Sequence, residues 1–268
     1  MVRETDGVAV GRDLVRRAST VCLVRDGDQL EVLMVQRPFT SRFMPGVWVF
    51  PGGAVDESDV DPPVQFGPAP HDDWKVAALR ELIEETGIWL TTTGAVERPT
   101  TDDALGDVAS SEHAIDPSAL IYFSNWITPK VFPIRFNTRF YVSHIGNDVQ
   151  GHVDGDELID LAWVNPHDAL DNEREGIWEV AFPTRETLKL FAAERSAADI
   201  ASRFRAVAGV PPVEPRLFVS ETEAKILLPD DPGFEDAGPS QEDPTILSRL
   251  SAVVSKGGRV PAELRARS

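Results

Sequence analysis

Three glutamates at the spacing of one helix face constrain this chain more than any other feature. Glu81, Glu84 and Glu85 lie at positions i, i+3 and i+4 of the run Arg80–Gly87, and on an α-helix this spacing gathers their carboxylates. Like charges so close together repel one another unless a cation lies among them. Carboxylate oxygens suit Mg²⁺ or Mn²⁺ better than zinc. The pattern predicts a helix that binds a divalent cation; the alternative is a solvated acidic face with an ion pair between Arg80 and Glu84.

The same segment has a second, apolar face. The expected helix begins near Trp74, after a capping aspartate at position 72 or 73, and runs to about Glu85. Gly87 follows, at a position where a left-handed residue commonly ends a helix. Apolar residues recur at helical spacing away from the glutamates: Val76, Leu79 and Ile83. This face predicts that the helix packs onto a core.

This helix and the glycine turn ahead of it resemble the Nudix box, the signature of hydrolases that cleave a nucleoside diphosphate linked to another moiety. The closing half matches as Arg-Glu-x-x-Glu-Glu-x-Gly over Arg80–Gly87, with Leu82 and Ile88 at the aliphatic positions. The opening half begins at Phe50–Gly53. The resemblance implies an α/β fold, a Nudix-type α/β/α sandwich with a mixed sheet. The order of strand-rich and helical segments agrees with such a sandwich.

A long insert divides the two halves of the box. In the family the arginine is the fourteenth residue after the second glycine, whereas Arg80 is the twenty-seventh residue after Gly53. Counting from the glycine puts Asp59 at the box glutamate, and counting back from the arginine puts Asp72 there; the sequence leaves both open. The insert, about residues 57–72, holds four prolines and no Lys or Arg. This composition predicts a surface loop.

The resemblance also implies roles for the site residues. The implied ligands of Mg²⁺ or Mn²⁺ are Glu81, Glu84, Glu85 and the backbone carbonyl of Gly53. Such a cation supplies a more acidic bound water and neutralises charge on the diphosphate, and a carboxylate takes the proton. Arg80 is expected to orient the glutamates by hydrogen bonding. The predicted catalytic residues are Arg80, Glu81 and Glu84, and Glu157 is a further candidate for the base.

A second pattern, upstream of the box, indicates a substrate. Residues Arg37–Gly53 follow Arg-x₄-Arg-x₃-Gly-x₃-Phe-Pro-Gly-Gly, which resembles the additional signature of Nudix hydrolases that cleave coenzyme A (CoA). The departures are Leu33–Val35 in place of Leu-Leu-Thr and Pro38 in place of Ser or Ala. Arg37 and Arg42 are suited to clamp phosphate oxygens; the alternative is that they lie in solvent or pair with an acidic neighbour. The divided box also resembles the branch that includes the mammalian peroxisomal CoA diphosphatase.

The charge balance limits the partners of the chain. With 44 acidic against 26 basic residues, the net charge is −18, which argues against nucleic acid and anionic membranes. The expected partner is a small nucleotide-type molecule, and the resemblance is compatible with a homodimer. Cys22 is the only cysteine, and we find neither a signal peptide nor a bilayer-spanning run. The last four residues, Arg265–Ser268, do not resemble a peroxisomal targeting signal. Together these features predict a cytoplasmic protein.

Two alternatives to CoA cleavage stay open. One keeps the chemistry but changes the substrate to ADP-ribose, NADH, a nucleotide sugar or a damaged nucleoside triphosphate. The other is a Nudix-like module that binds a nucleotide without cleaving it. Three aromatic residues either stack an adenine or fill the core: Trp126, Phe132 and Phe136. Three basic residues either hold a 3′-phosphate or line a solvated strand edge: Lys130, Arg135 and Arg139.

Hydrophobic patterning divides the chain into four parts. We expect a lead-in over residues 1–17, a Nudix domain over 18–182, a helical extension and hairpin over 183–228, and a tail over 229–268. At the start of the domain, two β-branched runs flank Asp26–Asp28, which predicts a hairpin with an Asp-Gly turn. Further strands are expected at Trp48–Phe50, Ala119–Thr128, Phe136–His144 and Leu161–Val164.

Overall fold

The structure is a computed structural model that describes residues 15–41, 44–68, 70–132, 134–153, 155–237 and 245–255. Arg42, one of the two arginines predicted to bind phosphate, lies outside this part of the chain. Among the described residues, no helix combines the length and the hydropathy needed to cross a lipid bilayer.

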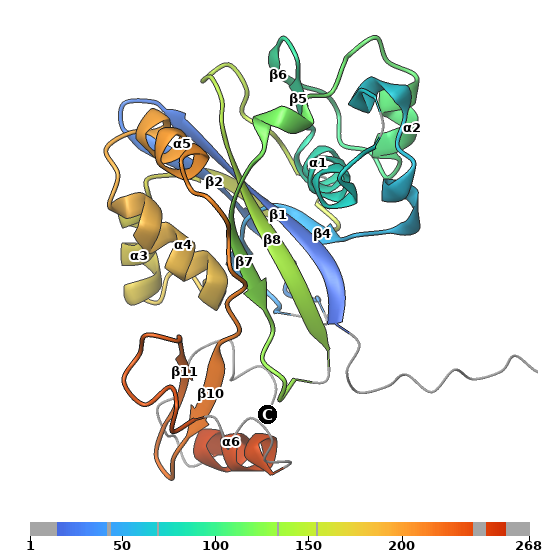
Figure 1. Cartoon of the computed structure of the whole chain (residues 1–268). Coiled ribbons are helices and arrows are strands. Elements are labelled where there is room, and N and C mark those ends of the chain that lie inside the picture. Colours follow the sequence, from blue (N-terminus) through green and yellow to red (C-terminus); the bar gives the residue numbers. More distant parts are fainter. Residues whose placement is uncertain are drawn as a thin grey trace, which may run out of the picture.

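A seven-stranded mixed sheet forms the centre of the molecule (Figure 1). Its strands are β1 (Val15–Asp26), β2 (Leu30–Gln36), β3 (Trp48–Val49), β4 (Gly52–Ala54), β7 (Ile121–Ile127), β8 (Arg135–His144) and β9 (Asp160–Val164). The order is β3-β2-β1-β8-β7, with β4 paired to β1 and β9 paired to β2. β1 and β8 run parallel, and the other pairs are antiparallel. The predicted hairpin of β1 and β2 is present.

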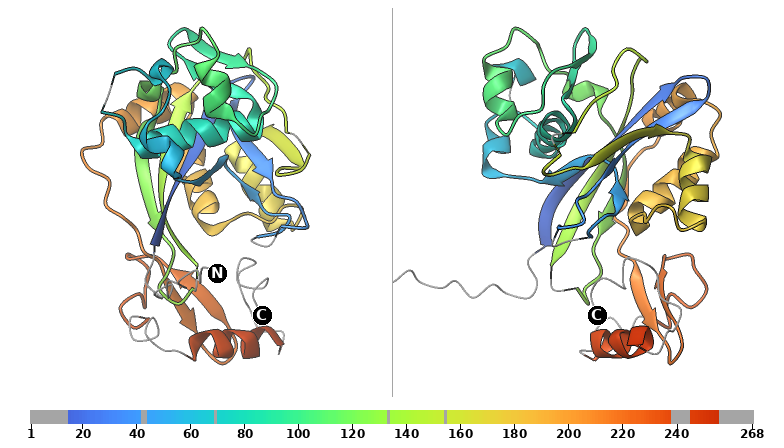
Figure 2. Two further views of the ribbon diagram at one scale, coloured as in Figure 1. Left: turned by 90° about the vertical axis from the view of Figure 1, so that its right-hand side faces the viewer. Right: turned by 180° about the vertical axis from the view of Figure 1, so that it is seen from behind.

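Further elements cover both faces of this sheet (Figures 1 and 2). One face carries α1 (Asp73–Thr86), α2 (Ala104–Ala109) and a small hairpin of β5 (Ile88–Thr91) and β6 (Gly94–Glu97). The other face carries α3 (Pro166–Arg174), α4 (Phe182–Ala192) and α5 (Ala197–Arg205). The predicted α/β sandwich with a mixed sheet and a helical extension is confirmed.

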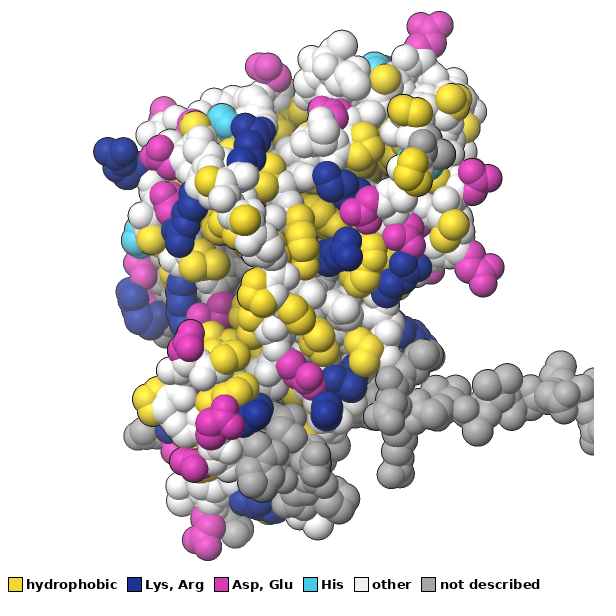
Figure 3. Space-filling model, in the orientation of Figure 1, with side chains coloured by type: hydrophobic (Ala, Val, Ile, Leu, Met, Phe, Trp, Pro, Cys, Tyr) yellow, Lys and Arg dark blue, Asp and Glu magenta, His cyan; other side chains and the backbone are white. Residues whose placement is uncertain are grey.

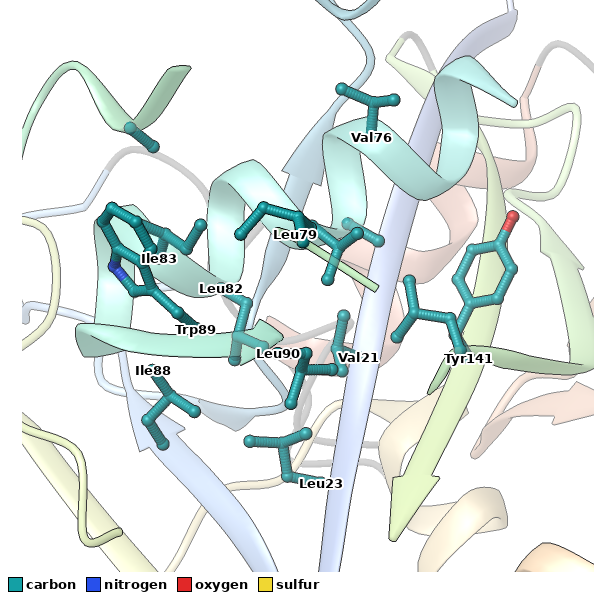
Figure 4. Close-up of a cluster of buried hydrophobic side chains, with 14 of the residues drawn as sticks. Val21, Leu23, Val76, Leu79, Leu82, Ile83, Ile88, Trp89, Leu90 and Tyr141 are labelled. Carbon is teal, nitrogen blue, oxygen red and sulfur yellow. The ribbon is translucent and has the colours of Figure 1, made fainter. Parts of the chain in front are cut away.

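Two apolar cores fill the spaces between the sheet and these layers. Successive residues of a strand point to opposite faces, so Val21 and Leu23 of β1 join the core under α1, whereas Cys22 and Val24 join the core under α4 and α5. Figure 4 shows α1 packed on the first core through the face predicted for it: Val76, Leu79 and Ile83. Because α1 buries this face, its glutamates are left to face β4 and the insert.

The chain after α5 forms a small unit beside one end of the sheet (Figure 1). It comprises β10 (Arg216–Val219), β11 (Ala224–Leu227) and α6 (Ile246–Ser255), whose apolar side chains share a separate core. The hairpin agrees with the prediction. Helix α6 lies in the segment predicted as a tail, and it buries Ile246 and Leu250 only because the hairpin supplies a partner for them.

Two segments differ from their predictions. Strand β1 begins at Val15, inside the predicted lead-in, because its first residues pair with β8. The insert forms two 3₁₀ turns, η1 (Glu57–Val60) and η2 (Val64–Phe66), in which Asp59 is 0% and Phe66 3% exposed. Most residues of these turns are exposed, as predicted for a surface loop, but the buried Asp59 and Phe66 were not predicted. The two turns are ordered by packing, since η1 lies against α1 and η2 against α2.

Candidate active site

Arg80 is the buried centre of the candidate site. It lies in the middle of α1, is 7% exposed, and donates to both carboxylate oxygens of Asp59, from Nε at 2.9 Å and from Nη2 at 3.1 Å. Such a bidentate pair fixes the plane of the guanidinium. Asp72 instead caps α1 by accepting a hydrogen bond from the Trp74 N–H at 3.1 Å. Of the two aspartates considered for the box glutamate, Asp59 therefore pairs with the arginine, whereas Asp72 caps the helix.

The same guanidinium holds two of the three glutamates. Nη1 of Arg80 donates to Oε1 of Glu81 and to Oε2 of Glu84, each at 2.9 Å, and Nη2 donates to the carbonyl of Ala54 at 2.9 Å. Burial alone lowers the pKa of Arg80, but the bond to Asp59 and the neighbouring carboxylates raise it overall above its usual value. The guanidinium is thus a permanently charged support for the cluster, the arrangement expected of an orienting residue.

The glycine turn brings the backbone to the other side of the cluster. The Gly52 N–H donates to Oε2 of Glu85 at 2.8 Å. A Cβ on Gly53 would lie 2.3 Å from Oε1 of Glu81, so this position has no room for a side chain. Pairing of β4 with β1, with Ser19 opposite Gly53, keeps the turn in place. Three of the predicted ligands, Glu81, Glu85 and Gly53, therefore lie together where α1 meets β4.

Burial and crowding raise the pKa values of the three glutamates. Burial raises the pKa of Glu81 to about 7 against the opposing effect of Arg80, and the charges of Glu84 and Glu157 add to the increase. Burial also raises the pKa of Glu85 well above its usual value, and the charge of Glu81 contributes. Burial likewise raises the pKa of Glu84. Glu157, from the loop before β9, thus acts on the cluster although it is remote in sequence.

The chemistry of these donors fits a divalent cation of the magnesium type. All of them are oxygens, and Arg80 compensates their negative charge only in part. Among the residues that the structure describes, no three acidic, histidine or cysteine side chains form a ready metal-binding group. One oxygen each of Glu81 and Glu84 is bonded to Arg80. Cation binding therefore has to use their remaining oxygens or a small shift of the carboxylates.

Arg37 lies next to the cluster, directly after β2. It is half-buried, and its positive charge opposes the rise in the pKa of Glu85 that burial causes. Its backbone N–H donates to the carbonyl of Val47 at 3.1 Å, which keeps the end of β2 beside the start of β3. The structure thus brings the first of the two predicted phosphate-binding arginines to the glutamates.

A cavity of about 260 Å³ opens beside Arg37 and Gly52. Six aromatic residues line it: Phe50, Trp126, Phe132, Phe136, Phe140 and Phe182. The three aromatic residues considered for adenine stacking are therefore all on the wall of this cavity.

Of the basic residues considered for a 3′-phosphate, Arg135 is buried against Glu214 at 2.8 Å, and Arg139 lies 3.5 Å from Asp72. No sequence pattern predicted the cavity, because its walls come from strands, loops and a helix that are distant along the chain.

Comparison with known proteins identifies the family. A model of the NUDIX domain matches residues 15–182. The chain belongs to the Nudix family. A Caenorhabditis elegans protein named "Putative nudix hydrolase 7" is 29% identical over 162 residues, which are 57% of this chain and 52% of that protein. The chain thus spans about half the length of this curated Nudix relative.

A solved Nudix structure supports the fold. The crystal structure of a NUDIX hydrolase from Alicyclobacillus acidocaldarius superposes with a TM-score of 0.60 and 31% sequence identity, covering 70% of this chain and 96% of that one. The predicted family, Nudix hydrolase, is thereby confirmed together with its α/β fold.

Proposed function

We propose that this chain is a metal-dependent Nudix hydrolase that cleaves the diphosphate bond of CoA, giving 3′,5′-ADP and phosphopantetheine, or that of acyl-CoA, giving 3′,5′-ADP and acyl-phosphopantetheine. The observation that carries the proposal is the set of three crowded glutamates between a buried arginine and a glycine turn. Glu81 and Glu84 are bonded to Arg80, and Glu85 is bonded to the Gly52 N–H. A protein that only bound a nucleotide would have no evident use for such a costly concentration of charge.

Each residue of the cluster has a role in this proposal. The proposed ligands of Mg²⁺ or Mn²⁺ are Glu81, Glu84, Glu85 and the carbonyl of Gly53. When bound, the ion supplies a more acidic water and neutralises charge on the diphosphate. Arg80 positions two of the carboxylates by its hydrogen bonds. The candidates for the group that accepts the proton from water are Glu81, Glu84 and Glu157, and comparing the pH–rate profiles of their glutamine variants distinguishes them.

The substrate is proposed from Arg37 and the cavity beside it. CoA carries a 3′-phosphate as well as a diphosphate, and the position of Arg37 next to the glutamates supports a role in binding phosphate oxygens. Arg42 is included in the proposed phosphate-binding pair only because of its sequence spacing from Arg37. A cytoplasmic location, a homodimer and the domain boundaries at 18 and 182 stay predictions.

The test is hydrolysis of CoA and acetyl-CoA beside ADP-ribose, NADH and a nucleotide sugar, with Mg²⁺ or Mn²⁺ and with products identified by mass. The proposal expects phosphopantetheine and 3′,5′-ADP to form faster than any product of the other substrates. An Arg37→Ala variant is expected to raise KM for CoA, whereas Arg16→Ala, on an exposed residue of β1, serves as the control. Selective cleavage of another substrate would leave a Nudix hydrolase but reject CoA, and no cleavage by folded, metal-loaded protein would favour a binding module.

A further inference from the structure

The cavity beside the glutamates has a wall that lies outside the Nudix domain. Most of its lining comes from the domain, but Ile226 lies on β11 of the C-terminal hairpin and Pro215 directly precedes β10, and both are beyond the residues 15–182 that match the family. Figure 3 shows hydrophobic side chains gathered on the face between the sheet and this C-terminal unit. The hairpin therefore contributes to the shape of the cavity.

Backbone and ionic contacts hold the hairpin at this place. The Ile127 N–H donates to the carbonyl of Val213, and the Val213 N–H donates to the carbonyl of Asn125, both at 2.8 Å. Arg135, which is buried, bonds with Glu214 at 2.8 Å. These contacts join the segment that leads into the hairpin to the last residues of β7 and the first residue of β8. The wall formed by Ile226 is thus part of the folded structure and not a loosely attached tail.

The lining chemistry limits what the cavity accepts. Arg37 is the only charged residue among the described residues that line it, and no carboxylate or amide side chain is present. The hydroxyl of Thr128, one of four lining threonines, already accepts a hydrogen bond from the Phe136 N–H at 3.0 Å. A polar group buried without a partner loses its hydrogen bonds to water, whereas an apolar chain gains from leaving water. The occupant that fits this lining is an apolar chain.

The cavity is continuous with the reaction site. Gly52 both lines the cavity and donates its N–H to Glu85, and Arg37 lies at the same end. A substrate whose diphosphate lies at the glutamates can therefore bring the acyl end of its non-nucleotide half to the Phe and Trp walls, while the pantetheine arm, with its two amides, stays on the solvent side of this lining. A volume of about 260 Å³ corresponds to roughly nine water molecules, which is room for a medium-length alkyl chain.

We propose that this cavity is the subsite for the acyl chain of an acyl-CoA substrate, and that Ile226 of the C-terminal hairpin limits the length of chain accepted. This inference rests on the proposed function, since it assigns the cavity to the phosphopantetheine half of the substrate. It makes Ile226 a specificity-determining residue supplied from outside the family domain.

Binding to the full-length protein tests the inference without catalysis. Phosphopantetheine and its acetyl, octanoyl and palmitoyl thioesters are titrated calorimetrically in the presence of a chelator. Each methylene buried is expected to tighten binding up to about fourfold, so the octanoyl form should bind at least about tenfold tighter than the acetyl form. If Ile226 limits the chain length, the palmitoyl form should bind no tighter than the octanoyl form.

A pair of variants on β11 locates the effect. Ile226→Trp fills the cavity and should remove most of the gain for octanoyl while leaving the acetyl form unchanged. Lys225→Ala is the matched control, because its exposed side chain belongs to the opposite face of the same strand, and it should match the wild type. Hydrogen exchange of the wild-type protein provides a readout without variants: octanoyl, but not acetyl, should protect the amides of residues 216–227.

Three results would overturn the inference. Equal affinities across the thioester series would show that the cavity takes no acyl chain. Weaker binding of 3′,5′-ADP to Ile226→Trp, with unchanged acyl binding, would assign the cavity to the nucleotide half. Failure of the wild type to cleave either CoA or octanoyl-CoA with Mg²⁺ or Mn²⁺, while it cleaves ADP-ribose, would reject the proposed function as well. Cleavage of unacylated CoA with equal thioester affinities would reject the acyl subsite alone.

Discussion

At the scale of residues, the site depends on one arginine that is fully engaged. Nε, Nη1 and Nη2 of Arg80 all donate hydrogen bonds, to Asp59, Glu81, Glu84 and the carbonyl of Ala54. A charge buried in this way is stable only while its partners remain. The pair of Arg80 and Asp59 thus connects the stability of the insert with the geometry of the glutamates.

We predict that Asp59→Asn lowers the free energy of unfolding by about 3 kcal/mol or more, because it leaves the buried guanidinium without its main counter-charge. Urea denaturation measures the change. Asp61→Asn, on an exposed residue of the same insert, is the control and should stay within about 0.5 kcal/mol of the wild type. A loss for Asp59→Asn as small as that of the control would contradict the central role of the pair.

A second prediction separates catalysis from stability at Glu84. Glu84→Gln keeps the size of the side chain and an oxygen for Arg80 but removes a charge needed for the reaction. We expect kcat to fall by about 10²- to 10⁴-fold, with a change in unfolding free energy within about 1 kcal/mol. Glu112→Gln, at an exposed position, should leave the rate unchanged. An unchanged rate in Glu84→Gln would reject the assignment of the cluster.

At the scale of elements, helix α1 carries the site because local signals specify both of its ends. Asp72 caps its first turn. Gly87 ends it in the left-handed conformation with φ of 66°, and its N–H donates to the carbonyl of Ile83. The carbonyl of Gly87 then accepts from the Arg98 N–H at 2.8 Å, which links α1 to the segment after β6.

We predict that Gly87→Ala destabilises the protein by more than about 2 kcal/mol. The left-handed conformation alone costs a non-glycine residue about 1–2 kcal/mol, and the new Cβ would lie 2.1 Å from the carbonyl oxygen of Arg98. Gly146→Ala is a fair comparison, since the nearest atom to its Cβ would be 3.7 Å away, and it should change little. Thermal and urea unfolding measure the stability of the two variants. Equal stability of Gly87→Ala and Gly146→Ala would contradict the prediction.

At the scale of the whole molecule, the stability of the metal-free protein depends on pH through its buried glutamates. Burial holds the pKa of Glu81 at about 7 in the folded protein, against an ordinary value near 4.5. The folded state therefore binds more protons than the unfolded chain between these pH values. The contribution of Glu81 to stability is present below about pH 4.5 and is lost as the pH rises through about 7.

We predict that Mg²⁺ or Mn²⁺ raises Tm more at pH 8 than at pH 5.5, because protons compete with the cation for the carboxylates. Differential scanning fluorimetry with and without EDTA measures the effect. In Glu81→Gln, the metal-free Tm should fall less between the two pH values than in the wild type. A metal effect equal at both pH values, or a wild-type pH profile retained in Glu81→Gln, would contradict this linkage.

Much of the fold and part of the site could be predicted because their signals are local. The strand alternation around Asp26–Asp28 and the helical spacing of the glutamates concern neighbours in sequence, and the structure agrees with both. The insert was predicted less well. Its prolines and acidic residues indicated a segment exposed to solvent, whereas Asp59 and Phe66 are buried. Helix α6 was missed because its apolar side gains a partner only from the hairpin.

The sequence by itself determined that α1 exists, where it begins and ends, and that its glutamates share a face, since caps and periodicity act within a few residues. It determined the family through the same local pattern. Only the tertiary structure decided that Asp59 rather than Asp72 holds Arg80, that Arg37 lies beside Glu85, and that Ile226 lines the cavity. These contacts join segments far apart in the chain, and which distant groups meet is decided by how the whole chain buries its apolar surface.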